Sequence, residues 1–192
     1  MGAASRLRLP GSLTVNLSPR TLEMDEFSIA ALLRIIVRHG LDPHKIVVEL
    51  TEREAVEDLG RLRRAVEDCR VAGIRVAADD VGSGNAGLRL LSQLRFDIVK
   101  IDLSLVQGGS HDQSLEVIRT LRDLADRWGA LVVAEGIETP AHLEAVRSLR
   151  IGAGQGYLLG RPAEQPPTTS IDLDGLVRGS GWLANQLLAT SG

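Results

Sequence analysis

Hydrophobic and polar positions along this chain follow two alternating patterns. Short apolar runs, typical of buried strands, alternate with longer stretches in which apolar residues recur every three or four positions, as in amphipathic helices. This alternation predicts an α/β protein built on a parallel sheet. The expected strands span residues 13–16, 46–49, 75–80, 98–100, 131–135 and 154–158.

The expected helices begin at capping residues and end near glycines. Ser18 and Pro19 supply an N-cap and a first-turn proline for a helix that continues to Gly40. The segment 51–54 has a capping-box pattern, which predicts a helix from there to Gly73. Further helices are expected over 88–94, 115–128, 139–152 and around 176–188.

Five of the six strands end in a polar residue that can hold a metal or a phosphate. In a barrel of parallel strands, the carboxyl ends of the strands converge on one mouth, where such enzymes carry out their chemistry. Side chains alternate between the two faces of a strand, so Asn16, Glu49, Asp79, Lys100 and Glu135 share the inward face, and their apolar neighbours face the covering helices. The sequence therefore predicts a TIM-like (β/α) barrel with these residues at its mouth: Asn16, Glu49, Asp79 with Asp80, Lys100 and Glu135.

The number of strand–helix units is smaller than a closed barrel requires. Such a barrel has eight units and typically about 250 residues, whereas the 192 residues contain about six units. We therefore expect a single domain that is an incomplete barrel lacking its N-terminal portion. Its expected parts are a leader over 1–12, barrel units over 13–162, and a linker with a C-terminal helix over 163–192.

The acidic strand ends indicate a metal site. Acids after strands often serve as helix N-caps, but Thr51 and Thr139 already occupy the cap positions after Glu49 and Glu135. Several carboxylates gathered in one mouth repel one another unless cations compensate, and oxygen-only ligands suit Mg²⁺ or Mn²⁺. A pair of neighbouring aspartates can bridge two such ions, an arrangement that clamps a phosphoester during hydrolysis.

Lys100 has three possible roles from sequence alone. It can face a phosphate or the attacking water as a fixed cation, or it can act as a counter-ion to the carboxylates. The third role is a Schiff-base nucleophile in a barrel lyase. The surrounding carboxylates disfavour that role because they keep the amine protonated.

Composition narrows the classes of protein further. The formal net charge is −3 and aromatic residues make up 3% of the chain, so a basic, aromatic groove for a DNA or RNA polymer is not expected. Cys69 is the only cysteine, which excludes an internal disulfide and a cysteine-rich metal site. No apolar run reaches the roughly 18 residues of a membrane span, and residues 1–12 lack a signal-peptide pattern. We expect a cytoplasmic protein.

Six motifs occur in order along the chain. They are Val15-Asn16-Leu17-Ser18, Glu49-Leu50-Thr51-Glu52, Asp79-Asp80-Val81-Gly82-Ser83-Gly84, Lys100-Ile101-Asp102, Ala134-Glu135-Gly136-Ile137-Glu138 and Gln155-Gly156-Tyr157. Together they resemble the EAL-domain phosphodiesterases, and the resemblance runs from about Leu9 to Pro162. Those enzymes hydrolyse the bacterial second messenger cyclic di-GMP to its linear dinucleotide, pGpG.

The resemblance implies a TIM-like barrel with two Mg²⁺ or Mn²⁺ ions and a role for each matching residue. One ion would be bound by Asn16, Glu49 and Asp79, and the other by Asp79, Asp80 and Glu135. Asp80, Lys100 and Glu135 would be catalytic, with Lys100 orienting the water or contacting the phosphate. The remaining roles are a loop anchor at Glu52, a substrate-pocket residue at Gln155, and supporting acids at Asp102 and Glu138.

One departure from the family pattern keeps a second function open. The Glu-Ala-Leu segment that names the family does not occur in the chain, although it supplies a further metal ligand in these enzymes. The alternative is therefore a catalytically inactive module that binds cyclic di-GMP or a partner protein in signalling. A homodimer is a further expectation from the resemblance.

Overall fold

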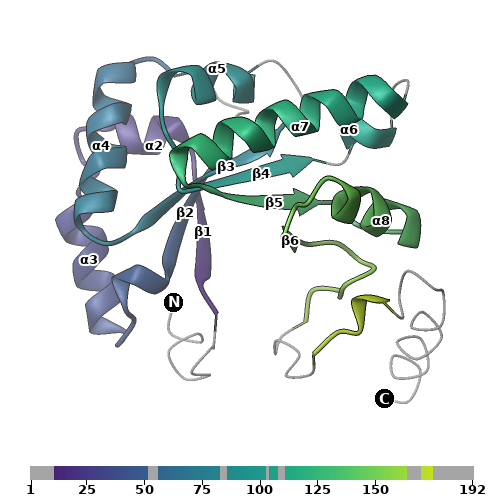
Figure 1. Ribbon diagram of the computed structural model, residues 1–192. Coiled ribbons are helices and arrows are strands. Elements are labelled where there is room, and N and C mark those ends of the chain that lie inside the picture. The colour runs from purple at the N-terminus through teal and green to yellow at the C-terminus, as the bar shows by residue number, and fades with distance from the viewer. Residues whose placement is uncertain are drawn as a thin grey trace. The chain divides into compact units, whose positions relative to one another are not determined.

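A computed structural model describes residues 11–51, 56–82, 86–102, 104–107, 111–163 and 170–174. Six strands form one sheet in sequence order, and the strand pairs whose register is defined are parallel (Figure 1). The α/β class predicted from the alternating pattern is thus confirmed. The strands are β1 (Leu13–Leu17), β2 (Ile46–Leu50), β3 (Arg75–Val81), β4 (Ile98–Asp102), β5 (Leu131–Glu135) and β6 (Ala153–Gly154).

Helices occupy most of the connections between these strands (Figure 1). The chain divides into two compact units, a first unit of residues 1–100 and 124–131 and a second unit of residues 101–123 and 132–192. The helices are α2 (Pro19–Glu23), α3 (Ile29–Arg38), the 3₁₀ turn η1 (Pro43–Lys45), α4 (Leu59–Val71), α5 (Ala86–Gln93), α6 (Ser104–Gln107), α7 (His111–Trp128) and α8 (Pro140–Ser148).

The core of the first unit forms around β2. Its residues are all buried, as expected for a strand in a parallel sheet that is covered on both faces. On α4, Leu62, Val66 and Cys69 recur at helical spacing and are at most 3% exposed, so this face of the helix is buried. The acidic ends of β2 and β3 therefore stand on a rigid, tightly packed support.

Two helix boundaries in the first unit differ from the prediction. The single helix expected from Ser18 to Gly40 is two helices, because Met24 adopts an extended conformation and Ser28 caps a new helix by accepting a bond from the Ala31 N–H. The helix expected from residue 51 begins only at Leu59, where the Asp58 side chain accepts a hydrogen bond from the Arg61 N–H at 3.0 Å. Residues 52–55 of the predicted capping box lie outside the described residues.

The second unit corrects one predicted strand. The strand expected over 154–158 is limited to β6, because the chain turns around Ile137 directly afterwards. The Ile137 N–H donates to the Gln155 carbonyl at 3.1 Å, and the Leu158 N–H donates to the Ile137 carbonyl at 3.0 Å. The Thr139 cap of α8 is confirmed, although this helix ends at Ser148. The helix expected around 176–188 lies outside the described residues.

Candidate active site

The first-unit part of the candidate site begins with the register of its strands. Asn16 on β1 pairs with Glu49 on β2, and Glu49 pairs with Ala77 on β3. Because side chains alternate along a strand, Asp79 lies on the same face as Ala77, one step closer to the carboxyl end. Asn16 is exposed, whereas Glu49 is 7% exposed. Parallel pairing thus brings three of the predicted metal ligands to one edge of the sheet.

Lys100 connects two of these acids. Its ammonium group donates to Asp79 Oδ1 at 2.6 Å and lies 3.2 Å from Glu49 Oε1. The three side chains are 9–13% exposed, so little water screens their charges. In this geometry Lys100 pairs with both carboxylates, and its role toward water or a phosphate stays a prediction. The geometry also disfavours the Schiff-base role, since two carboxylates stabilise the charged ammonium form.

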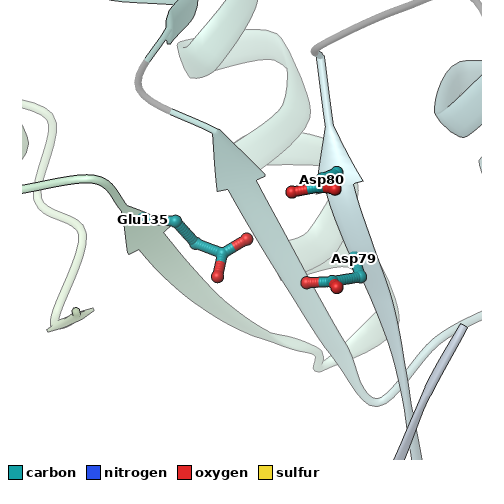
Figure 2. Close-up of side chains that lie close together, drawn as sticks. All are labelled: Asp79, Asp80 and Glu135. Carbon is teal, nitrogen blue, oxygen red and sulfur yellow. The ribbon is translucent and has the colours of Figure 1, made fainter. Parts of the chain in front are cut away.

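Asp79 and Asp80 form an adjacent pair of acids on β3, where Figure 2 labels them. Each offers a carboxylate oxygen within 4.8 Å of an oxygen of the other. The backbone of Asp80 has a φ of 54°, in the left-handed region that few residues other than glycine adopt. Backbone strain of this kind is concentrated at functional sites, where the surrounding structure holds it in place.

The residues of this unit fit a hard divalent cation. Glu49, Asp79 and Asp80 carry three negative charges against the single positive charge of Lys100. The excess of two negative charges matches the charge of Mg²⁺ or Mn²⁺, and carboxylate oxygens are the ligands that these ions prefer. The donor set therefore suits such an ion on chemical grounds.

The second unit supplies a different arrangement at the end of β5. Glu135 is 9% exposed, and its Oε1 accepts a hydrogen bond from the side-chain amide of Gln155 (Glu135 is labelled in Figure 2). This contact was not predicted, because the two residues lie 20 positions apart. The register offers a signal afterwards: Ala134 pairs with Gly154, so Glu135 and Gln155 follow as the next pair.

Two further predicted residues, Asp102 and Glu138, make other contacts. Asp102 accepts a hydrogen bond from the Ser104 N–H at 2.7 Å and so caps the next turn. Glu138 is exposed, and its backbone N–H donates to His142 Nδ1 at 3.4 Å. Glu52 lies outside the described residues. Their supporting roles stay predictions.

Sequence reasoning did not single out one buried acid in the first unit. Glu23, the last residue of α2, is 8% exposed and accepts a hydrogen bond from the Glu57 N–H at 3.1 Å. No periodic or motif signal distinguishes it from the exposed acids nearby.

None of the helices in the described part of the chain is long and apolar enough to cross a membrane.

Comparison with known proteins identifies the family. The family model described as EAL domain matches residues 3–162. A curated relative is the probable cyclic di-GMP phosphodiesterase PdeA of Escherichia coli, 32% identical over 150 residues, which covers 78% of this chain and 20% of PdeA. The chain spans about a fifth of the length of the curated relatives it matches.

Solved structures agree with this assignment. Klebsiella pneumoniae BlrP1, in its manganese and cyclic di-GMP complex, is 31% identical with a TM-score of 0.76, over 84% of this chain and 42% of that chain. A standalone EAL protein of Vibrio cholerae, in its cyclic di-GMP-bound form, is 28% identical with a TM-score of 0.79, over 90% and 73%. These neighbours confirm the barrel-like fold. The chain belongs to the EAL domain family.

Proposed function

We propose that this chain hydrolyses cyclic di-GMP to linear pGpG by a two-metal mechanism. The observation that carries the proposal is the buried cluster of Glu49, Asp79 and Lys100 at the carboxyl ends of neighbouring strands. The family membership supports the substrate, since PdeA is named for cyclic di-GMP hydrolysis and BlrP1 was solved with manganese and cyclic di-GMP.

The proposed ligands divide between two Mg²⁺ or Mn²⁺ ions. Asn16, Glu49 and Asp79 would hold one ion, and Asp79, Asp80 and Glu135 would hold the other, with Asp79 shared. The register of β1 with β2 supports the first set, and the short separation of the Asp79 and Asp80 oxygens supports the second. When bound, the ions supply positive charge that stabilises the phosphodiester as it is attacked.

The proposed reaction breaks one phosphodiester bond and consumes one water. The water oxygen forms a bond to phosphorus, and the bond from phosphorus to the 3′ oxygen breaks. One proton of the water passes to the 3′ oxygen, so the product carries a 5′-phosphate at one end and a 3′-hydroxyl at the other. Lys100 would orient the water or contact the phosphate, since its ammonium donates hydrogen bonds but accepts none.

The test is conversion of cyclic di-GMP by the purified chain in Mn²⁺, followed by anion-exchange chromatography. We expect pGpG from the wild type and a loss of at least about 100-fold in Asp79→Asn, the upper end of what outer partners of a metal site contribute. Glu26→Gln is a matched control because Glu26 is exposed and belongs to neither ligand set. Equal rates in Asp79→Asn and the wild type would refute the assignment.

A binding module is the second candidate. Equilibrium dialysis with Ca²⁺ and cyclic di-GMP separates the two functions: saturable binding without product in Mn²⁺ supports the module, whereas product formation supports the enzyme. A homodimer and a cytoplasmic location also stay predictions, and sedimentation of the purified chain tests the first.

A further inference from the structure

The contact between Gln155 and Glu135 is built by the backbone on both sides. Val133 pairs with Ala153 and Ala134 with Gly154, so the two site residues follow as the next step of the same register. The Gln155 N–H donates to the Ala134 carbonyl at 2.8 Å. The position of Gln155 beside Glu135 is therefore dictated by strand pairing rather than by a flexible loop.

Gly156 and Ile137 hold this pair in place. Ile137 is 1% exposed, and its N–H donates to the Gln155 carbonyl at 3.1 Å. A Cβ atom at Gly156 would lie 2.2 Å from the Ile137 carbonyl oxygen and 2.3 Å from the Ile137 nitrogen. Both distances are shorter than the non-bonded contacts that Cβ atoms make in proteins. Only glycine permits this close approach, which fixes the backbone immediately after Gln155.

The side-chain contact restrains a carboxylate without cancelling its charge. The Gln155 amide donates to Glu135 Oε1, and this anchor restricts rotation of a carboxylate that is 9% exposed. An amide is neutral, so the carboxylate keeps its full negative charge for a cation. Carboxylates that bind metals are commonly oriented by hydrogen bonds of this kind, and losing them typically costs 10–100-fold in metal affinity.

We propose that Gln155 is a positioning residue that orients Glu135 for a divalent cation, in place of a direct contact with the nucleotide. The inference rests on the proposed function, because it assigns Glu135 to a metal. It differs from the substrate-pocket role that the family resemblance implies for Gln155. The geometry of the second unit alone carries it, through the register, the Ile137–Gly156 contact and the amide–carboxylate bond.

The first experiment measures Mn²⁺ binding by isothermal titration calorimetry in Gln155→Met, which preserves side-chain length and removes the donor. We expect Mn²⁺ affinity to fall about 10-fold or more. At saturating Mn²⁺, kcat should fall while KM for cyclic di-GMP changes less than about 2-fold, because ground-state contacts with the nucleotide are untouched. Gln93→Met on α5 is the matched control and should resemble the wild type.

Two results would overturn the inference. An unchanged Mn²⁺ affinity with KM raised about 10-fold would assign Gln155 to the nucleotide instead. Unchanged values for both quantities would remove any role for the contact. Gln155 is exposed, so the Met substitution is compatible with folding, and circular dichroism of the variant checks this directly.

A second measurement separates this inference from the proposed function. The side-chain amide resonances of Gln155, observed by ¹⁵N-edited NMR without metal, should move in Glu135→Gln and stay in place in Glu138→Gln, whose side chain is exposed. Resonances that do not move in Glu135→Gln contradict the inference. If the wild type neither binds Mn²⁺ nor cleaves cyclic di-GMP, the proposed function fails, and the positioning role fails with it even if the NMR contact is present.

Discussion

Glu49 and Glu135 are two buried carboxylates with different partners. Glu49 lies 3.2 Å from the Lys100 ammonium, whereas Glu135 accepts a hydrogen bond from the neutral amide of Gln155. Both are less than 10% exposed. A cation stabilises a buried acid in the absence of metal and competes with a metal for it, whereas an amide orients the acid and leaves its charge available. The comparison predicts that the two units respond differently to losing these partners.

The largest expected effect is that of Lys100→Met. Removing the ammonium leaves Glu49 and Asp79 buried without the cation between them, which should lower the free energy of unfolding by about 3–5 kcal/mol in the absence of metal. Mn²⁺ should restore much of that loss, since it supplies the missing positive charge. Urea unfolding with and without Mn²⁺ measures both quantities. A variant as stable as the wild type without metal would contradict the stabilisation of Glu49 and Asp79 by the Lys100 ammonium.

A steric change should disturb the Glu135 side of the comparison. Gly156→Ala places a Cβ atom within 2.2–2.6 Å of the Ile137 backbone, so we expect a loss of about 3 kcal/mol in unfolding free energy, at the upper end for overpacking. Gly152→Ala is the matched control because nothing lies within 4 Å of its Cβ position. Thermal denaturation of both variants is the measurement, and equal melting temperatures would mean that the Ile137 contact is not restrictive.

The Cys69 thiol is another buried group that lies near acidic side chains, here Asp68 and Asp97. Burial, together with the negative charges of Asp68 and Asp97, raises the pKa of the Cys69 thiol from 9.0 to about 11. Folding therefore favours the neutral thiol, and its contribution is fully present below pH 9 and lost as the pH rises toward 11. The expected loss is about 2–3 kcal/mol.

Urea unfolding between pH 8 and 11 tests this prediction. Cys69→Ala removes the thiol, so its unfolding free energy should decline less steeply over that pH range. Asp97→Asn should lower the pKa of the thiol, since one of the nearby negative charges is lost. Identical pH profiles for the wild type and Cys69→Ala would contradict the expectation.

The smallest expected effect is at Arg61, which bridges two acids as Lys100 does. Its guanidinium lies 2.5 Å from Asp25 and 3.4 Å from Asp58, but these side chains are 42–82% exposed. Water and salt screen such pairs, so Arg61→Met should cost less than about 1 kcal/mol. Chemical unfolding in low and high salt checks it. A cost as large as that of Lys100→Met would show that burial is not what separates the two cations.

Much of the candidate site could be predicted because it depends on local patterns. The polar residues at the ends of apolar runs fall at the ends of β1 to β5, since strand formation depends on short-range alternation and apolar content. The cap at Thr139 was also predictable, because its hydrogen bond to the His142 N–H spans only three residues. The break at Met24 was missed because Ser28 provides a second cap within a stretch that has no glycine or proline between residues 20 and 39 and could otherwise continue as one helix.

The sequence by itself determined the α/β class, the order of strand ends and the kinds of ligand atoms, because periodicity and side-chain chemistry are local properties. Only the tertiary structure decided which acid has which partner. Lys100 lies between Glu49 and Asp79, and Gln155 contacts Glu135, because parallel pairing brings together residues 20 to 51 positions apart. Such contacts depend on register and on close backbone approach, as at Gly156, and neither leaves a periodic signal in the chain.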